Sequence, residues 1–218
     1  MLLCIKNIFE RVKKMKIKIC GIKQPEHAYA AATAGADFIG LIFVPSSHRA
    51  VTVNTARIIS QAARDGGAEP VGVFTEASAT DMLNICQTAN INYVQLHGNY
   101  SREQQHLLPD SFSRIYVYPV SAEGNFTLDE NIKLLDKKRD YLLFDNHKAG
   151  SGKTFDWQKF SYAGDFKWFL SGGLNPNNVK EAIQLFHPTG VDVSSGVENI
   201  KGEKDLNLIK KFIGETKL

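Results

Sequence analysis

The sequence predicts one α/β domain, a (β/α)8 TIM barrel behind a short N-terminal extension. Short apolar runs alternate along the chain with longer stretches of helical periodicity, and the runs give eight strand candidates. Strict alternation is typical of parallel βα units, and eight units in about 200 residues fit the compact end of the size range of such barrels. A doubly wound open sheet usually has five or six strands, so the strand count disfavours that alternative.

The eight expected strands are apolar runs bounded by turn, polar or charged residues. They cover residues 16–20, 37–43, 70–74, 93–96, 113–118, 140–145, 167–170 and 190–193. The stretches between them that are expected to be helical are 25–34, 53–64, 78–89, 101–108, 127–138, 176–186 and 203–214. Asn175 stands before Pro176, as an N-cap residue stands before a proline at the first helical position. Ser101 stands three residues before Gln104, which predicts a capped helix start there.

Charge separates the first residues from the rest of the chain. The formal charge of the chain is +3, and residues 1–14 hold four basic side chains and one acidic side chain, so residues 15–218 are neutral overall. A neutral body lacks the basic surface of a nucleic-acid-binding protein. In residues 1–14 the charges follow the apolar residues and no cleavage site comes after them, unlike a secretory signal. We therefore expect 1–14 to be a disordered or short helical extension, Met15 to be a candidate native start, and 15–218 to be the barrel.

The cysteine content indicates the compartment. Cys4, Cys20 and Cys86 are odd in number, widely spaced and without a C-x-x-C motif. This pattern indicates neither a disulfide framework nor a zinc site, and it fits a reducing cytoplasm. No stretch approaches the ~20 apolar residues of a membrane span. The chain is expected to be cytoplasmic, with no metal, no nucleic acid and no membrane partner.

In a barrel of this kind the functional site forms where the strands end and the βα loops begin. The first strand ends at Cys20, and alternation puts Lys18 and Cys20 on one face and Ile17 and Ile19 on the other. If the isoleucines face the helices, Cys20 faces the mouth of the barrel. A lone cysteine is more often a small core residue than a catalyst. Near cationic groups, however, a thiolate is an effective base or nucleophile.

Asp145 ends the sixth expected strand, directly after two leucines and a phenylalanine. A carboxyl group there is costly to bury unless its pKa rises or it finds partners. Asp145 is therefore either an acceptor for N–H groups of the following loop or a general acid. Because Cys20 and Asp145 belong to strands one and six, we expect them to lie across one pocket. An acid and a base so placed can move protons on two faces of a substrate without a metal.

Two loops of small residues follow the last two strands, at 171–175 (SGGLN) and 194–198 (SSGVE). Small residues let backbone N–H groups approach an anion, and these two loop positions are the usual phosphate site of the fold. One such loop alone is as well explained by an ordinary turn, whereas two in these positions favour phosphate. The expected phosphate-binding residues are Ser171, Gly172, Gly173, Ser194, Ser195 and Gly196.

Two more residues near strand ends are candidates. Arg49 lies in the loop after strand two, where an arginine is either an ordinary surface residue or a two-pronged ligand for a carboxylate. His97 follows strand four, and it either orients a substrate or satisfies loop carbonyl groups. The sequence leaves both pairs of alternatives open.

Six motifs together resemble the phosphoribosylanthranilate isomerase family. They are KICGI at 18–22, the loop at 45–49, QLHG at 95–98, GSGKTFDW at 150–157, LSGGLNPNNV at 170–179 and VDVSSGVE at 191–198. The resemblance runs in the family's order from Met15 to the C-terminus. It implies a (β/α)8 barrel of tryptophan biosynthesis that needs no cofactor. The implied reaction is an Amadori rearrangement, an aldose–ketose isomerisation of N-(5-phosphoribosyl)anthranilate to 1-(2-carboxyphenylamino)-1-deoxyribulose 5-phosphate.

Carried over motif by motif, the resemblance implies a role for each candidate. Cys20 matches the family's general base, and Asp145 matches its general acid. Arg49 matches the arginine that binds the anthranilate carboxylate, and the two serine-glycine loops match those that hold the sugar phosphate. The expected substrate-binding residues are Arg49, His97, Gly150 and Gly152. The partner is then a small phosphorylated substrate, and the chain is expected to be a monomer or a homodimer.

The chain departs from the family at two loops. Tyr118-Pro119 stands where Lys-Ala is frequent, and Ala149-Gly150 stands where a glycine pair is usual. Neither departure touches the expected acid or base.

The sequence also allows two rival functions. One is a barrel enzyme that forms a Schiff base through Lys148 or Lys18, but Lys148 lies in a loop where a desolvated amine is hard to arrange. The other is a binding barrel that keeps the phosphate loops without the chemistry. The presence of both Cys20 and Asp145 disfavours the second rival.

Overall fold

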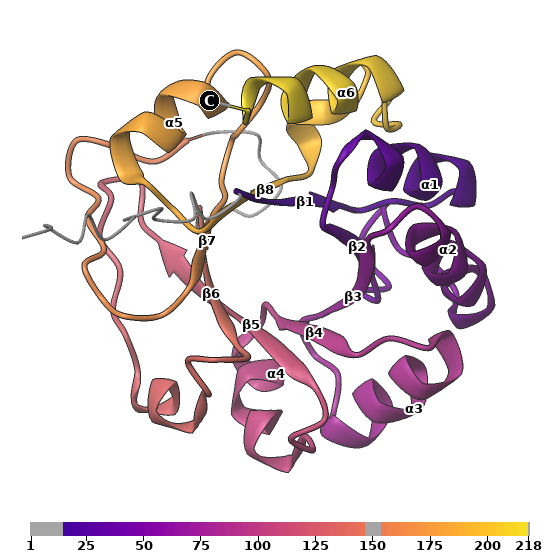
Figure 1. Ribbon diagram of the computed structural model, residues 1–218. Helices are drawn as coiled ribbons and strands as arrows, with labels where there is room; N and C mark the ends of the chain where they lie inside the picture. Colours follow the sequence, from indigo (N-terminus) through magenta and orange to yellow (C-terminus); the bar gives the residue numbers. More distant parts are fainter. Residues whose placement is uncertain (1–14, 147–153, 218) are drawn as a thin grey trace, which may run out of the picture.

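A computed structural model of the chain describes residues 15–146 and 154–217. Eight parallel strands form a closed barrel in sequence order, because β1 pairs with β2 on one side and with β8 on the other. The strands are β1 (Lys16–Cys20), β2 (Phe38–Ile42), β3 (Glu69–Phe74), β4 (Tyr93–Leu96), β5 (Ser113–Val120), β6 (Tyr141–Asn146), β7 (Trp168–Leu170) and β8 (Gly190–Val193). Figure 1 looks along the barrel, with the strands as an inner ring and the helices outside it. The predicted barrel is confirmed, and each strand lies within two residues of its expected position.

The outer layer is less regular than the strands. Its α-helices are α1 (Pro25–Ala34), α2 (Val53–Asp65), α3 (Ala79–Ala89), α4 (Asn99–Glu103), α5 (Val179–Phe186) and α6 (Leu206–Glu215). Short 3-10 helices form at η1 (Gln104–Leu107), η2 (Glu130–Leu134) and η3 (Ser195–Val197). Side-chain caps start α2 and α3, because Thr52 accepts the N–H of Thr55 and Ser78 accepts that of Asp81. The positions of α1, α2 and α3 confirm the helices expected over 25–34, 53–64 and 78–89.

Alternation of side chains in the strands produces two apolar cores. The core inside the barrel consists of Phe38, Val71, Ile115, Val117, Tyr141, Leu143 and Phe169. Ile17 and Ile19 of β1 belong instead to the larger core between the sheet and the helices, together with Ala28 of α1. The isoleucines therefore face the helices, and Lys18 and Cys20 face inward as the alternation predicts.

The helix expected over 127–138 is wrong. Only η2 forms there, and none of its side chains is buried, so no apolar face anchors a longer helix to the barrel. Asp129, just before η2, is bound to strand β5 instead. Its carboxylate accepts hydrogen bonds from the hydroxyl groups of Tyr116 (2.8 Å) and Tyr118 (3.2 Å).

The helix expected over 101–108 is also wrong in its start and its type. The α-helical part begins at Asn99 and continues after Glu103 only as a 3-10 helix. Ser101 lies inside α4 rather than at its cap, and its buried hydroxyl donates to the carbonyl oxygen of Phe74 at 3.1 Å. That bond ties the helix to the end of β3.

The last two helices begin three residues later than expected. α5 begins at Val179 because the Asn175 side chain accepts the N–H of Asn177 at 2.9 Å and forms a turn first. α6 begins at Leu206, where Asp205 accepts the N–H groups of the first turn.

Aromatic side chains cover the barrel between β6 and β7. Residues 154–167 of this connection form turns and contain no helix. The ring of Phe160 contacts the rings of Phe126, Phe144 and Trp168. This cluster shields β6 where a helix usually lies in a βα unit.

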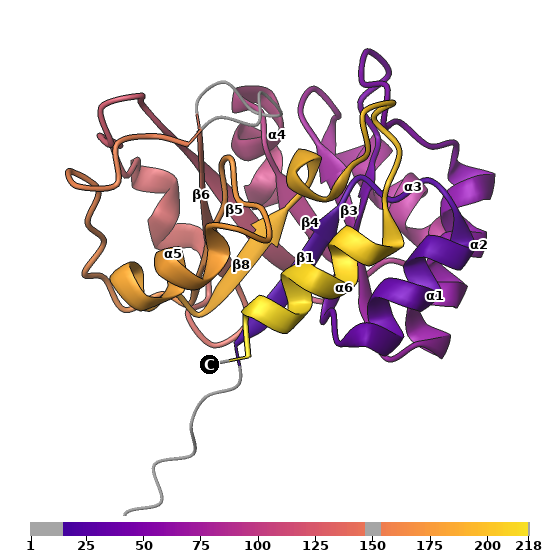
Figure 2. The same cartoon turned by 90° about the horizontal axis from the view of Figure 1, so that it is seen from above.

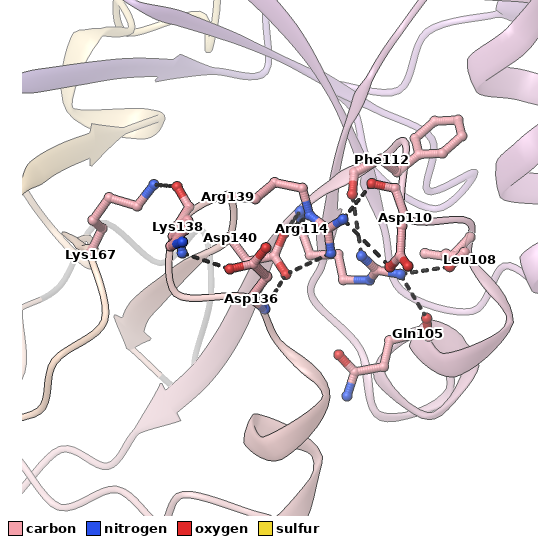
Figure 3. Close-up of polar contacts among 10 residues, drawn as sticks. All are labelled: Gln105, Leu108, Asp110, Phe112, Arg114, Asp136, Lys138, Arg139, Asp140 and Lys167. Atoms are coloured by element: carbon pink, nitrogen blue, oxygen red, sulfur yellow. Dashed lines mark hydrogen bonds and ion pairs between the residues drawn. The ribbon is translucent and has the colours of Figure 1, made fainter.

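A buried polar network lies at the amino ends of β5 and β6 (Figure 3). The Arg114 guanidinium donates to the carbonyl oxygens of Leu108 (2.6 Å) and Phe112 (3.2 Å). The carboxylate of Asp140 accepts the backbone N–H groups of Arg114 (2.9 Å) and Asp136 (2.8 Å). The network satisfies buried polar groups at the end of the barrel that usually serves stability.

Figure 2 shows the barrel from the side, with the loops that follow the strands along the upper edge. In the part of the chain that the structure describes, no helix combines the length and apolar character needed to cross a bilayer. The expected boundary between residues 14 and 15 stays a prediction, because residues 1–14 lie outside the described residues.

Candidate active site

A cavity of about 260 Å³ opens at the carboxyl ends of the strands. The candidate residues found in its wall are Cys20, Arg49, His97, Asp145, Ser171, Gly172, Gly173, Ser194 and Ser195. A concave site with a few convergent polar groups is the usual form of a small-molecule site. The barrel therefore brings into one cavity candidate residues that lie between Cys20 and Ser195 in the sequence.

Cys20 is the last residue of β1, and its side chain is buried in the cavity wall. Burial raises the pKa of the thiol, while the positive charges of Lys18 and Lys204 partly offset this effect and Asp192 adds to it. The free thiol is therefore mostly protonated at neutral pH, and the thiolate depends on its cationic neighbours.

Asp145 lies at the end of β6 and is also buried. Its Oδ1 accepts the backbone N–H of Asn146 at 2.9 Å, which fits the first of the two interpretations of this residue. Burial nevertheless raises the pKa of the carboxyl group to about 7, with a further contribution from the charge of Asp192. A carboxyl group that keeps its proton near neutral pH can act as a general acid.

His97 faces Asp145, with Nε2 3.5 Å from Oδ2. Its Nδ1 lies 3.0 Å from the side-chain amide nitrogen of Gln95. Because burial lowers the pKa of His97 to about 4, the imidazole is neutral at pH 7 and its contact with Asp145 is not an ion pair. The imidazole ring of His97 therefore contacts the side chains of Gln95 and Asp145, both of which are in the cavity wall.

Arg49 is held in the cavity wall by a carboxylate. Its Nε and Nη2 donate to the two oxygens of Glu198, at 2.7 and 2.8 Å. Lys204 donates to the same Glu198 carboxylate at 2.7 Å and to the carbonyl oxygen of Ser194 at 2.8 Å. Burial opposes the charge of Glu198, but Arg49 and Lys204 together lower the pKa of its carboxyl group. Two cations and one anion leave a net positive charge at this side of the cavity.

A second buried ion pair borders the cavity, with Asp192 in the cavity wall. Lys18 of β1 donates to Asp192 of β8 at 2.9 Å, and the two residues are register partners in the β1–β8 ladder. The other oxygen of Asp192 accepts the hydroxyl of Ser171 at 3.2 Å. Although burial opposes its charge, Asp192 and Cys20 raise the pKa of Lys18. Lys18 is therefore protonated at neutral pH.

The two small-residue loops lie beside each other. Gly172 and Gly173 have φ angles of 89° and 72°, which favour glycine. Gly196 is not part of the cavity wall. A Cβ at this position would lie 1.9 Å from the carbonyl oxygen of Leu174. The glycine therefore permits close packing of the two loops. The second loop contains the short 3-10 helix η3.

A family model described as N-(5'-phosphoribosyl)anthranilate (PRA) isomerase matches residues 17–215. The N-(5'-phosphoribosyl)anthranilate isomerase of Chlamydia felis is 40% identical over 205 residues, which cover 94% of this chain and 98% of that protein. The solved structure of the isomerase from Thermotoga maritima has a TM-score of 0.75 at 33% identity, and the match covers 93% of this chain and 98% of that one.

The chain belongs to the N-(5'-phosphoribosyl)anthranilate isomerase family. It is accordingly an isomerase of tryptophan biosynthesis, and the predicted family is confirmed. Another phosphoribosylanthranilate isomerase structure, with a TM-score of 0.72 at 33% identity over 93% of this chain and 98% of that one, is a complex with reduced 1-(o-carboxyphenylamino)-1-deoxyribulose 5-phosphate. A further one, from Thermotoga maritima, is described as monomers generated from a dimeric isomerase.

Within this isomerase, the expected substrate residues Gly150 and Gly152 lie outside the described residues, and so does Lys148 of the rival Schiff-base mechanism. The other rival nucleophile, Lys18, is protonated and paired with Asp192, so it does not provide the neutral amine that a Schiff base requires. Among the described residues, no three His, Cys, Asp or Glu side chains are grouped as metal ligands would be.

Sequence reasoning missed Asp192, Glu198 and Lys204 as parts of the site. Asp192 had a readable signal, because a carboxylate between two valines of an expected strand must face the barrel interior or the helices. Glu198 and Lys204 gave no comparable signal. Their contact with Arg49 depends on how the loops after β2 and β8 fold toward each other.

Proposed function

We propose that this isomerase converts N-(5-phosphoribosyl)anthranilate to 1-(2-carboxyphenylamino)-1-deoxyribulose 5-phosphate with Asp145 as general acid and Cys20 as general base. The observation that carries the proposal is that both side chains line one cavity at the carboxyl ends of β1 and β6. The raised pKa of Asp145, about 7, supports its role as the proton donor.

The first step is opening of the ribose ring. Asp145 gives its proton to the furanose ring oxygen, the bond from that oxygen to C1 breaks, and the lone pair of the substrate's amine nitrogen forms the C=N bond of a protonated Schiff base. A carboxyl group of pKa about 7 holds this proton at neutral pH and still releases it readily. His97, 3.5 Å away and neutral, limits the ways in which the carboxyl group can turn.

The second step is proton removal from carbon. The Cys20 thiolate takes the proton from C2, and the electrons of the C–H bond move into the C1–C2 bond while those of the C=N bond return to nitrogen. The resulting enolamine tautomerises to the ketone product. The substrate's own nitrogen accepts the electrons, so the step requires no cofactor as electron sink. Each assisted proton transfer typically contributes about 10²- to 10⁴-fold to the rate.

The remaining candidates position the substrate. Arg49 binds the anthranilate carboxylate, since two of its nitrogens are fixed by Glu198 and the guanidinium still has N–H groups to donate. The loops with Ser171, Gly172, Gly173, Ser194, Ser195 and Gly196 bind the phosphate at the other side. His97, Gly150 and Gly152 complete the proposed substrate contacts. The proposed partner is this small molecule alone, and the oligomeric state stays a prediction of monomer or homodimer.

The experiment that tests the proposal follows the fluorescence of phosphoribosylanthranilate as it disappears on addition of the protein. Asp145→Asn and Cys20→Ala are assayed beside the parent chain. Asp65→Asn, an exposed aspartate at the end of α2, serves as the matched control. We expect rapid loss with the parent and the control and almost none with the two site variants. Both variants should still bind a reduced product analogue, because the acid and the base act in the chemical steps.

Two outcomes contradict the proposal. Near-parental turnover by Cys20→Ala rejects the thiol as base. No turnover by folded parent protein favours a binding barrel that keeps the phosphate loops without the chemistry.

A further inference from the structure

A lysine side chain is fully enclosed inside the barrel. Lys18 is 0% exposed, and among the described residues the barrel interior also holds an apolar core of seven buried side chains. Its ammonium group contacts Asp192, its partner across the β1–β8 ladder, at 2.9 Å. This pair of one cation and one anion borders the cavity, because Asp192 is part of the cavity wall.

Stability does not explain this arrangement. Removing two charges from water is expensive, and replacing a buried ion pair with well-packed apolar side chains is often neutral or stabilising. The interior of this barrel is already filled by aromatic and branched side chains, so an apolar pair would fit the surroundings. A buried ion pair at the edge of a cavity points to a role in that site.

Lys18 and Cys20 lie on the same face of β1, two residues apart, with their side chains directed into the barrel. Gly40 of β2 is the register partner of Cys20. A Cβ at Gly40 would lie 2.7 Å from the Cys20 Sγ and 3.1 Å from the Lys18 Nζ. The sulfur and the ammonium thus border the same small space, which the absence of a side chain at position 40 leaves open. Because both atoms lie close to this one point, the charge of the ammonium group is near enough to change the ionisation of the thiol.

We propose that Lys18 is a positioning residue that stabilises the Cys20 thiolate, with Asp192 holding its ammonium group beside the sulfur. The inference rests on the proposed role of Cys20 as general base. Lys18 touches neither of the reacting substrate atoms in this proposal, and it acts only by raising the fraction of Cys20 that is ionised.

Four charged side chains influence the thiol from the surrounding elements. Lys18 belongs to β1 and Asp192 to β8, Lys204 precedes α6, and Arg49 lies between β2 and α2. Burial raises the pKa of Cys20, and among these neighbours Lys18 opposes that effect most strongly. Lys204, which is bound to Glu198, has a smaller effect on the thiol than Lys18 has, although Asp192 offsets part of the charge of Lys18. Lys18 is consequently the cation on which the thiolate depends most.

The experiment measures the ionisation of the thiol directly. Cys4→Ser and Cys86→Ala leave Cys20 as the single cysteine of the chain. The rate of alkylation of this protein by iodoacetamide is then measured from pH 6 to pH 10. Only the thiolate reacts, so the rate reports the fraction of ionised Cys20. Lys18→Met is compared with the unsubstituted lysine. Lys16→Met is the matched control, because Lys16 is on the same strand and pairs with Asp37 at 2.8 Å, away from the cavity.

We expect Lys18→Met to shift the alkylation profile to higher pH by at least one unit and to slow alkylation at pH 7.5 about tenfold, since one pKa unit is a tenfold change in ionisation. At that pH kcat should fall by a similar factor with little change in KM. Lys16→Met should leave the profile and kcat unchanged.

If Lys18→Met does not fold, Lys18→Met combined with Asp192→Asn removes both charges and leaves no unpaired carboxylate. Its profile should shift in the same direction by a smaller amount, because Asp192 on its own disfavours the thiolate. Superimposable alkylation profiles for the folded Lys18 variant and the unsubstituted lysine overturn the inference. Because alkylation needs no turnover, this failure is distinct from failure of the proposed function, which would appear as turnover by Cys20→Ala.

Discussion

Arg49 and Glu198 form a two-pronged ion pair in the wall of the cavity, with Nε to Oε1 at 2.7 Å and Nη2 to Oε2 at 2.8 Å. The residue proposed to bind the substrate carboxylate therefore already carries a protein carboxylate on one edge of its guanidinium. Such a pair fixes the plane of the guanidinium and leaves the remaining N–H groups pointing in defined directions. Glu198 is itself held by Lys204 at 2.7 Å. We interpret this group as a preorganised receptor for one more carboxylate.

Replacement of Arg49 should mainly affect substrate binding. For Arg49→Ala we expect KM to rise roughly 10- to 100-fold with kcat changed only a few-fold, because hydrogen bonds to a charged group are lost equally in the ground state and the transition state. Glu198→Gln should raise KM by a smaller factor, since the guanidinium remains but is no longer held in one orientation. Steady-state kinetics with phosphoribosylanthranilate measure both effects.

Glu203→Gln is the control for Glu198→Gln, because Glu203 is a more exposed glutamate of the same loop and pairs with Lys23. It should leave KM unchanged. A lower KM in Glu198→Gln would mean that Glu198 competes with the substrate carboxylate, and the preorganisation argument would then be wrong.

The sequence was sufficient for the residues whose position follows from local rules. Strand ends can be located from apolar runs, and parallel strands of a barrel bring their carboxyl ends together, so Cys20 and Asp145 could be placed in one pocket. The pairs Lys18–Asp192 and Arg49–Glu198 join residues 174 and 149 positions apart. Their contacts depend on strand register and loop folding, which no local pattern specifies.

The prediction of a helix over 127–138 was wrong for a related reason. Helical periodicity and propensity are weak where no apolar face is buried, and tertiary contacts then decide the local structure. Here Tyr116 and Tyr118 bind the carboxylate of Asp129, and the following segment forms only the short η2. These hydroxyl contacts join two elements and have no signature within the segment itself.

The pH dependence of kcat/KM should reflect the ionisation of both Asp145 and Cys20. In the proposed mechanism the active form has a protonated Asp145, whose pKa is about 7, and an ionised Cys20, whose pKa is raised by burial. Below pH 7, each decrease of one pH unit lowers the ionised fraction of Cys20 tenfold while Asp145 stays protonated, so kcat/KM should fall as pH is lowered. Between the two pKa values the gain in thiolate cancels the loss of protonated Asp145, so kcat/KM should be level. It should fall again only above the pKa of the thiol.

The measurement is kcat/KM from pH 5 to pH 10 in buffers of constant ionic strength. A profile that already falls between pH 7 and pH 8 would require a thiol that is fully ionised below pH 7, which contradicts the effect of burial on Cys20.

Asp145 should reduce the stability of the protein at neutral pH. Its pKa is raised from an ordinary value of 3.8 to about 7 by burial, so the native state holds this proton over a pH range in which the unfolded state has lost it. The free energy of unfolding therefore decreases as pH rises from about 4 to 7 and is unaffected by this group above that range. Asp145→Asn removes the decrease. We expect the variant to gain about 1–4 kcal/mol relative to the parent between pH 4 and pH 7.5.

Urea unfolding at the two pH values, compared between the variant and the parent, measures this difference. The exposed Asp65→Asn serves again as control and should show no pH-dependent gain. An Asp145→Asn variant whose stability relative to the parent is the same at both pH values would show that the pKa of this carboxyl group is not raised.

The network around Arg114 should support stability without contributing to catalysis. Arg114 is 4% exposed and Asp140 is 0% exposed, and they lie at the amino ends of β5 and β6, opposite the cavity (Figure 3). Arg114→Met leaves the carbonyl oxygens of Leu108 and Phe112 without this donor in a buried site. Because unpaired buried polar groups are expensive, we expect a loss of about 2–4 kcal/mol in the free energy of unfolding. In the folded variant, kcat and KM should remain within about twofold of the parent, since the site lies at the other end of the strands.

Lys137→Met is the control, because Lys137 pairs at 3.0 Å with an exposed Asp165 on the same side of the barrel, and exposed pairs contribute about 0–1 kcal/mol. Urea unfolding measures the free energy of unfolding, and steady-state kinetics on the same preparations measure kcat and KM. An Arg114→Met variant that is as stable as the parent, or that folds with a greatly reduced kcat, would contradict the assignment of stability to one end of the barrel and catalysis to the other.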